Sequence, residues 1–274
     1  MLDRIETANG LTDIAGVRIE LIKRGTGRPL LLLHPAIGIK SADRAIEELA
    51  RSFTVIAPSH PGFGRSELPR AMTTVDDLAY FYLDVMDALD LRDVVLAGVS
   101  FGGWIAAEIA IKSTERLSHV VLADAVGIKL GDREQRDIVD IFTTKQSEID
   151  RLAFHDPKIA AIDHASISDE DAHILFRNRE ATALFAWSPY MYDPKLASRL
   201  HRIRVPTLVL WGASDRIASP DYGRAYSKLI AGAQFELIED AGHYPHIERP
   251  DLFTRKIVEF VSRARDPAGN DRDR

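Results

Sequence analysis

Short, fully apolar runs recur along the chain, and each of them ends in small or turn-forming residues. They occupy residues 30–33, 55–57, 94–97, 120–123 and 208–211, and a further strand is expected at residues 235–238. Runs of this length without polar alternation are typical of strands that are buried on both faces of a sheet. Amphipathic stretches of helical length separate them, at residues 42–51, 75–89, 103–113, 221–230 and 251–263. The alternation predicts an α/β fold with a mostly parallel sheet flanked by helices.

The chain ahead of the first buried run has a different pattern. Residues 12–23 alternate imperfectly between apolar and polar side chains, and a glycine-rich turn at residues 25–27 follows them. Such a segment is typical of a hairpin or meander. We therefore expect antiparallel strands at one edge of the sheet.

Two predicted helices begin with recognisable capping chemistry. Thr74 is followed three residues later by Asp77, which is the spacing of a capping box. Ser219 stands directly before Pro220, so that a capping side chain precedes a proline in the first helical position. These pairs support helices that start near residues 75 and 220.

The regular alternation stops between residues 129 and 202. This stretch holds no clean buried strand, only polar segments of helical character at 133–141 and 169–185. We predict that residues 129–202 form a helical cap inserted into a core made of residues 1–128 and 203–264. Residues 265–274 are rich in Asp, Arg, Pro and Gly and are expected to form a flexible tail.

Composition excludes several classes of function. The net charge is −6, and basic residues do not gather in runs, so we expect no nucleic-acid partner. The chain has no cysteine, which excludes disulfides, thiolate metal sites and a cysteine nucleophile. The first residues are partly acidic and no apolar run approaches the length of a bilayer span, so we expect a cytoplasmic protein without membrane contact.

The strongest chemical signal is a G-x-S-x-G motif made by Gly98, Ser100 and Gly102 between a buried run and a predicted helix. A serine on so sharp a turn needs neighbours without bulk, and its hydroxyl is then held above the sheet at a helix N-terminus. The alternative is a glycine-rich turn that carries an incidental serine. The context favours a nucleophile, provided that a base and an acid follow in the chain.

Two later loops offer the base and the acid. Asp215 follows the buried run at 208–211, and His243 follows the strand expected at 235–238. Both loops are expected at the same sheet edge as Ser100, where ligands bind in open α/β sheets. Asp124, at the end of the run 120–123, is the alternative acid, although we favour Asp215.

Only one of the nine histidines stands in a position that suits a base. His243 follows a glycine just past a predicted strand end, whereas the neighbouring His246 does not. We expect most other histidines at the surface or in the cap.

At this point a family resemblance becomes specific. Three segments in chain order look like the signature segments of the α/β-hydrolase superfamily: Gly98-Val99-Ser100-Phe101-Gly102, Trp211-Gly212-Ala213-Ser214-Asp215 and Gly242-His243-Tyr244-Pro245. The resemblance spans nearly the whole chain. It implies an eight-stranded, mostly parallel sheet and a capped, carboxylesterase-like serine hydrolase with Ser100, His243 and Asp215 as catalytic triad. It also implies an acyl-enzyme and no metal or organic cofactor.

A further segment that begins at His34 resembles the family's H-G-x-x-G loop. In the family this loop supplies one donor of the oxyanion hole, and the residue after the nucleophile supplies the other. Pro35 stands in the usual glycine position and has no N–H, so the resemblance implies the backbone N–H groups of Ala36 and Phe101 as donors. We expect His34 to brace the loop. The turn at residues 59–66 resembles the family's D-x-P-G-x-G-x-S turn, with Ser59 in place of the aspartate, and is expected to be structural.

An aromatic cluster in the predicted cap bears on the substrate. Its members are Phe185, Trp187, Tyr190 and Tyr192, together with Met191. These side chains either line an apolar substrate pocket or hold the cap to the core, and the sequence does not separate the two roles.

The predicted substrate is a small carboxylic ester. Relatives that cleave carbon–carbon bonds in ring-fission products commonly carry a tryptophan after the catalytic histidine, whereas Tyr244 stands here. Carbon–carbon bond hydrolysis is the alternative, and a small-molecule receptor on the same fold is a second one. We expect a monomer or a homodimer.

Overall fold

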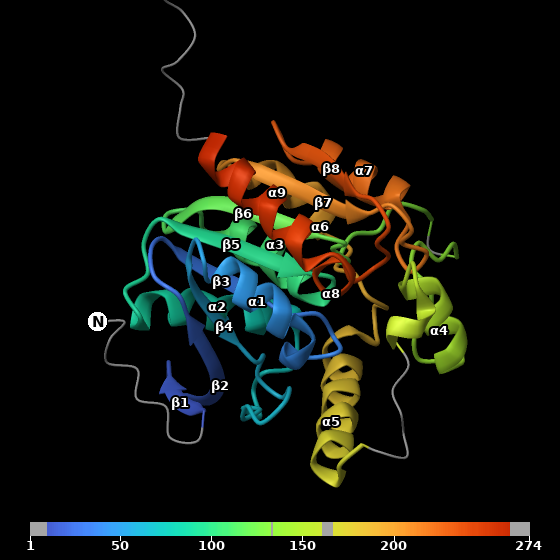
Figure 1. Ribbon diagram of the computed structural model, residues 1–274, viewed down its shortest axis with the longest axis horizontal. Coiled ribbons are helices and arrows are strands. Elements are labelled where there is room, and N and C mark those ends of the chain that lie inside the picture. Colours follow the sequence, from blue (N-terminus) through green and yellow to red (C-terminus); the bar gives the residue numbers. More distant parts are fainter. Residues whose placement is uncertain (1–9, 133, 161–166, 264–274) are drawn as a thin grey trace, which may run out of the picture.

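A single eight-stranded sheet forms the centre of the protein (Figure 1). The computed structural model describes residues 10–132, 134–160 and 167–263. In chain order the strands are β1 (Leu11–Ile14), β2 (Val17–Arg24), β3 (Pro29–Leu33), β4 (Thr54–Pro58), β5 (Val94–Val99), β6 (Leu117–Ala123), β7 (Thr207–Gly212) and β8 (Gln234–Ile238). The spatial order is β1-β2-β4-β3-β5-β6-β7-β8. The chain therefore has the predicted α/β fold, and every predicted buried run lies in a strand.

The antiparallel edge is also confirmed. β1 pairs antiparallel with β2, and β2 pairs antiparallel with β4, whereas all the other pairs are parallel. Ala15 and Gly16 connect β1 to β2 with φ angles of 50° and 77°, the left-handed conformation that a tight hairpin turn requires.

Helices cover both faces of the sheet. The longer ones are α1 (Asp43–Leu49), α2 (Val75–Ala88), α3 (Phe101–Lys112), α4 (Gln146–Ala153), α5 (Asp169–Ala186), α7 (Pro220–Lys228) and α9 (Pro250–Arg263), and the short ones are α6 (Leu196–Arg199) and α8 (Pro245–Glu248). The single turns of 3-10 helix are η2 (Ile39–Ala42), η3 (Pro157–Ala160) and η4 (Leu200–Arg202). Apolar side chains of α1 and α9 form one core with the sheet, and those of α2, α3 and α7 form a second core on the opposite face.

Both predicted helix caps are present. The Thr74 side chain accepts a hydrogen bond from the backbone N–H of Asp77 at 3.1 Å, and the Asp77 carboxylate accepts from the N–H of Thr74. The Ser219 hydroxyl accepts from the N–H of Tyr222 at 3.3 Å at the start of α7. Each side chain satisfies a backbone donor that the first helical turn leaves without a partner.

The predicted helix at 133–141 is wrong. Residues 134–141 form bends and turns in which aspartate side chains bind nearby backbone groups. Asp137 accepts from the N–H of Leu130 at 2.9 Å, and Asp140 accepts from the N–H of Phe142 at 3.0 Å. Such local bonds offer the backbone an alternative to a helix. The second predicted helix of this stretch is present as α5.

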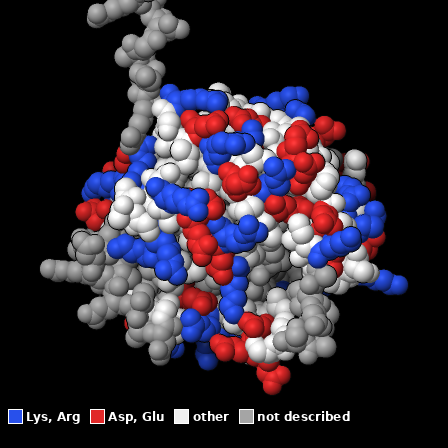
Figure 2. Space-filling view, in the orientation of Figure 1, with Lys and Arg blue, Asp and Glu red and all other residues white. Residues whose placement is uncertain are grey.

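The surface matches the mixed charge of the sequence. Figure 2 shows acidic and basic side chains interleaved over the face that carries α1 and α9. In the part of the chain that the structure describes, no helix is both long and apolar enough to cross a membrane. The segment predicted as a tail, residues 265–274, lies outside the described residues.

Candidate active site

Ser100 occupies a strained turn between β5 and α3. Its φ of 52° and ψ of −113° lie in a region that residues with a side chain rarely adopt. The turn is tight, because a Cβ atom added to Gly98 would lie 2.2 Å from the carbonyl oxygen of Gly102. The Ser100 N–H donates to the carbonyl of Ala123 at 2.9 Å. The serine is thus fixed at the strand end with its hydroxyl at the N-terminus of α3.

Three side chains that are far apart in the sequence form one chain of hydrogen bonds. The Nε2 atom of His243 lies 2.8 Å from the Oγ of Ser100, and its Nδ1 atom lies 2.7 Å from the Oδ2 of Asp215. Since a carboxylate accepts from Nδ1–H, Nε2 carries no proton and accepts from the serine hydroxyl. The exposed fractions of these residues are only 6% for Ser100 and 2% for Asp215 and for His243.

The second oxygen of Asp215 is also fixed. Its Oδ1 accepts from the backbone N–H groups of Ile217 at 2.8 Å and Ala218 at 3.1 Å. These bonds set the orientation in which Oδ2 faces the imidazole. Together with Nδ1–H of His243, they give the Asp215 carboxylate three N–H donors.

The loop that carries His243 is held from two sides. The His243 N–H donates to the carbonyl of Ala153, the last residue of α4, at 2.6 Å. Glu248 accepts from the N–H of Gly242 at 2.6 Å through one carboxylate oxygen and from the N–H of His155 at 2.9 Å through the other. The roles of Ala153 and Glu248 were not predicted from the sequence. The contact of Ala153 uses a backbone carbonyl and leaves no signal in the sequence, whereas Glu248 lies five residues after His243.

The first turn of α3 touches the loop that follows β3. A Cβ atom added to Gly102 would lie 2.2 Å from the carbonyl oxygen of Leu33 and 2.6 Å from that of His34. The loop that leads to Ala36 therefore starts beside Phe101. Among the described residues, neither the N–H of Ala36 nor that of Phe101 donates to another group. Within the described part of the chain, these two backbone donors have no acceptor.

His34 braces this loop, as expected from the sequence. Its Nε2 accepts from the N–H of His60 at 2.9 Å, so the proton is on Nδ1, which donates to the carbonyl of Pro35 at 2.7 Å. Burial lowers the pKa of His34 to about 4. The side chain is neutral near pH 7 and both of its ring nitrogens are engaged.

The expectation for the remaining histidines is wrong in three cases. His60, His119 and His246 are buried in the core and lie neither at the surface nor in the predicted cap. A neutral imidazole packs in a core as an aromatic ring, and nothing in the local sequence distinguishes it from an exposed one.

Asp124, the alternative acid, also lies at this site. It is fully buried, and its Oδ1 accepts from the N–H of Gly212 at 2.8 Å. Asp215, and not Asp124, bonds the imidazole. One donor atom from each of Asp124, Asp215 and His243 lies within 4.8 Å of the others, a set of residue types that can hold a metal ion. A metal fits poorly here, because both ring nitrogens of His243 already bond Ser100 and Asp215.

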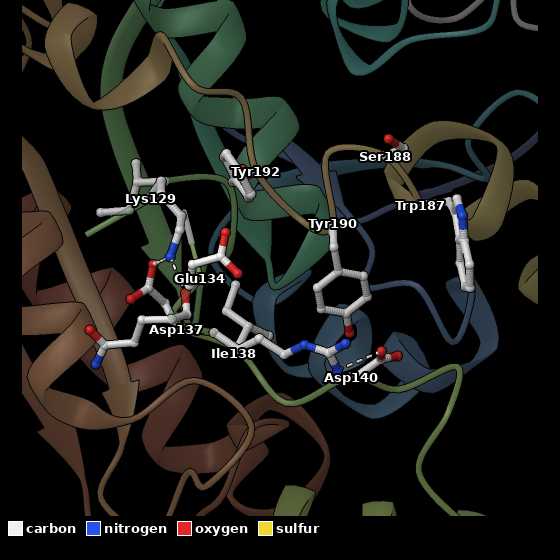
Figure 3. A pocket seen from close by; sticks show the side chains of 12 residues that line it. Lys129, Glu134, Asp137, Ile138, Asp140, Trp187, Ser188, Tyr190 and Tyr192 are labelled. Carbon is white, nitrogen blue, oxygen red and sulfur yellow. Dashed lines mark hydrogen bonds and ion pairs between the residues drawn. The ribbon is translucent and has the colours of Figure 1, made fainter. Parts of the chain in front are cut away.

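The predicted aromatic cluster divides into two parts. Phe185 is buried, and its ring centroid lies 6.4 Å from that of Phe101, beside the nucleophile. Trp187, Tyr190 and Tyr192 instead line a separate cavity of about 460 Å³ (Figure 3). The Tyr190 hydroxyl is engaged, since it donates to one backbone carbonyl at 2.7 Å and accepts from a backbone N–H at 2.8 Å.

The cavity of Figure 3 also has a charged wall. Lys129 forms an ion pair with Asp137 at 2.8 Å, and Arg136 forms one with Asp140 at 2.7 Å. Ser100, His243 and Asp215 do not line this cavity. The structure therefore brings Phe185 to the nucleophile and leaves the other three aromatic residues in a different part of the segment 129–202.

Known proteins similar to this chain share its hydrolase fold. The model of the alpha/beta hydrolase family matches residues 30–256. The 2-hydroxymuconate semialdehyde hydrolase of Pseudomonas sp. (strain CF600) is 31% identical over 265 residues, which cover 91% of this chain and 92% of that protein. The 2-hydroxy-6-oxo-2,4-heptadienoate hydrolase of a Pseudomonas putida strain is 28% identical, with 90% of this chain and 94% of that protein covered.

Solved structures agree with this fold. A meta-cleavage product hydrolase from Pseudomonas fluorescens IP01 superposes with a TM-score of 0.74 at 22% identity, and the match covers 94% of this chain and 100% of that one. A thermophilic esterase from Thermogutta terrifontis superposes with a TM-score of 0.72 at 26% identity, covering 93% of this chain and 97% of that one. Similar folds thus carry different substrate specificities.

Proposed function

Because this chain belongs to the α/β-hydrolase family, we propose that it hydrolyses a carbonyl compound through an acyl-enzyme formed on Ser100. The observation that carries the proposal is the buried chain of hydrogen bonds from Ser100 through His243 to Asp215. A serine hydroxyl is a weak nucleophile near neutral pH and reacts only when a base removes its proton. In this site the base and the group that orients it are already in place.

The reaction follows from the geometry in two steps. His243 takes the hydroxyl proton while Ser100 attacks the carbonyl carbon, and Asp215 stabilises the imidazolium that forms. The N–H groups of Phe101 and Ala36 stabilise the oxyanion, and the N-terminus of α3 adds its dipole. His243 then gives its proton to the leaving group. In the second step His243 removes a proton from water, which attacks the acyl carbon. The bond to the Oγ of Ser100 breaks, His243 returns the proton to Oγ, and the acid is released.

The relatives favour one substrate class. The two Pseudomonas relatives reported above are named for hydrolysis of 2-hydroxymuconate semialdehyde and 2-hydroxy-6-oxo-2,4-heptadienoate, and each match covers at least 90% of this chain. We infer that the substrate of this protein is a ring-fission product of the same chemical class. In this reaction the leaving group is a carbon atom, so the proton from His243 goes to carbon. This proposal replaces the preference for esters that the sequence suggested.

A carboxylic ester is the second candidate, and one residue favours it. Tyr244 follows the proposed catalytic histidine, and its ring centroid lies 5.0 Å from that of His243 and 5.3 Å from that of Phe154. The residue beside the proposed base thus differs from the tryptophan common in relatives that cleave carbon–carbon bonds. Residues 129–202 would act as the cap that selects between the two substrates, with Phe185 as the aromatic residue nearest the nucleophile.

The experiment has a labelling arm and a substrate arm. A fluorophosphonate should label the wild-type protein at Ser100, as mapped by peptide mass spectrometry, and should not label Ser100→Ala. Turnover is measured with 2-hydroxymuconate semialdehyde, by the loss of its dienolate absorbance, and with p-nitrophenyl esters of increasing acyl length. Ser100→Ala should lose activity on the order of a millionfold.

The control variant is Ser118→Ala, because the hydroxyl of Ser118 in β6 only donates to the backbone carbonyls of Asp93 and Val94 at the start of β5. This variant should retain labelling and turnover. Labelling without turnover of either substrate class would favour a receptor. Absence of labelling in the wild-type protein would contradict the proposed mechanism.

A further inference from the structure

The buried carboxyl group of Asp124 has no role in the mechanism above. Asp124 follows β6, the strand between β5, which carries Ser100, and β7, which leads to Asp215. Its φ is 44°, an unfavourable angle for a residue with a side chain. One carboxyl oxygen accepts from the N–H of Gly212, while Oδ2 makes no hydrogen bond with the described residues. Burying a charged carboxylate oxygen without a hydrogen-bond partner lowers the stability of the fold, and the group avoids this cost by taking up a proton.

The neighbours of Asp124 explain how this cost is avoided. A carboxyl oxygen of Asp124, one of Asp215 and a ring nitrogen of His243 lie within 4.8 Å of one another. Two buried carboxyl groups at this distance do not both ionise, because their like charges repel. Asp215 accepts three N–H groups, whereas Asp124 accepts one. Burial and the neighbouring Asp215 raise the pKa of Asp124, so the proton of the pair resides on Asp124.

On the basis of the function proposed above, we propose that Asp124 is a reserve acid of the triad. With Asp215 in place, Asp124 is a neutral carboxylic acid that does not bond the imidazole. When a neutral residue replaces Asp215, Asp124 releases its proton and its carboxylate stabilises the imidazolium of His243. The proton passes to solvent, and no other bond changes.

Every titratable group that faces Asp124 supports this assignment. Among the described residues they are Asp215 after β7, His243 after β8, Glu248 in α8 and Tyr244, the residue after His243. Burial, then the Asp215 carboxylate and to a smaller extent Glu248, raise the pKa of Asp124 well above its usual range. Replacing Asp215 by asparagine removes the second of these causes and leaves His243 without its nearest anion. Both changes favour ionisation of Asp124.

The test is a double-mutant cycle with Asp124→Asn, Asp215→Asn and the combined variant. The rate of fluorophosphonate labelling of Ser100 and the turnover of a p-nitrophenyl ester are the two readouts. An asparagine at 124 has the shape of the neutral acid, so Asp124→Asn alone should stay within about threefold of the wild type. Asp215→Asn should lose less than the roughly ten-thousandfold measured for isosteric replacement of a triad aspartate elsewhere. Adding Asp124→Asn to it should cost at least about a further tenfold.

A purely structural role gives a different result. In that case Asp124→Asn lowers both rates by the same factor whether or not Asp215 is present, and the proposal is overturned. The pH profile is a second readout: every variant should lose activity when its base, His243, is protonated, and Asp215→Asn should show a further loss where Asp124 takes up a proton, which the combined variant should lack. Identical pH profiles in Asp215→Asn and in the combined variant would also overturn the proposal.

Two controls keep the outcomes distinct. Near-UV circular dichroism checks that each variant is folded, and Asp215→Ser replaces Asp215→Asn in the cycle if the latter is not. Failure of the proposed function gives a different pattern, because the wild-type protein itself is then not labelled at Ser100. If the wild type is labelled at Ser100 and Asp124→Asn lowers the rates by the same factor with and without Asp215, the role of Asp124 is contradicted and the proposed function is not.

Discussion

The imidazole rings of His34 and His60 stack in the core, with their centroids 3.7 Å apart and their planes inclined by 30°. The Nε2–H of His60 donates to the carbonyl of His34 at 2.9 Å, and the Tyr82 hydroxyl donates to the Nδ1 of His60 at 2.6 Å. Burial holds the pKa of both histidines below the ordinary value. The pair is therefore neutral and fixes the start of the loop that carries Ala36.

Tyr82→Phe tests this arrangement with the smallest possible change. The substitution removes one hydroxyl and leaves the Nδ1 of His60 buried without its donor. We expect the free energy of unfolding to fall by about 1–3 kcal/mol in urea titrations. Tyr80→Phe is the matched control on the same helix, because its side chain is exposed, and it should change the value by less than about 0.5 kcal/mol. Equal values for the two variants would contradict a structural role for the Tyr82 hydroxyl.

Glu248→Gln tests the link between α4 and the His243 loop. The glutamine keeps the shape of the side chain but turns one acceptor oxygen into a donor that faces a backbone N–H of Gly242 or His155. We expect a loss of about 1–3 kcal/mol in the free energy of unfolding. Labelling of Ser100 by a fluorophosphonate should also slow, since the loop that positions His243 loses a bond.

The control for this substitution is Glu239→Gln. Glu239 lies shortly before the same loop, and its side chain is exposed. Stability and labelling rate should both remain at wild-type values. If Glu248→Gln behaves in the same way, the carboxylate of Glu248 does not hold the loop.

Buried His246 predicts a specific loss of stability in acid. Burial, more than the neighbouring His243 and His34, lowers its pKa from 6.5 to about 3. Between these two pH values the unfolded chain binds a proton that the folded protein does not. The free energy of unfolding therefore decreases as pH falls through this range, on the order of 1 kcal/mol per pH unit for this residue. Above pH 6.5 the contribution is constant.

His246→Leu removes this titration. In denaturant titrations between pH 7 and about 4.5, the free energy of unfolding of the variant should decrease less steeply with falling pH than that of the wild type. The difference in slope should correspond to at most one proton taken up on unfolding. His173→Leu is the control, because the side chain of His173 is exposed in the folded protein. The same slope in all three proteins would show that His246 takes up its proton without unfolding.

Local patterns predicted much of the fold. The apolar runs identified the strands because a strand buried on both faces cannot carry polar side chains. The capping pairs at Thr74 and Ser219 identified helix starts, since the bonds involved span only three residues. The same logic failed in the segment 133–141, where side chains compete with the helix for backbone donors. It also missed α4, in which Ile149 and Ala153 are the only buried residues.

The sequence by itself determined the strained turn at Ser100 and the strand ends after which Asp215 and His243 stand, because glycine spacing and apolar runs are local properties. Only the tertiary structure decided that Asp215, and not Asp124, bonds the imidazole, since both acids end neighbouring strands and the choice depends on the loop after β7. It also decided that Phe185, and not Trp187, Tyr190 or Tyr192, lies beside Phe101. Contacts between distant segments depend on how whole strands and helices pack, and no local pattern contains that information.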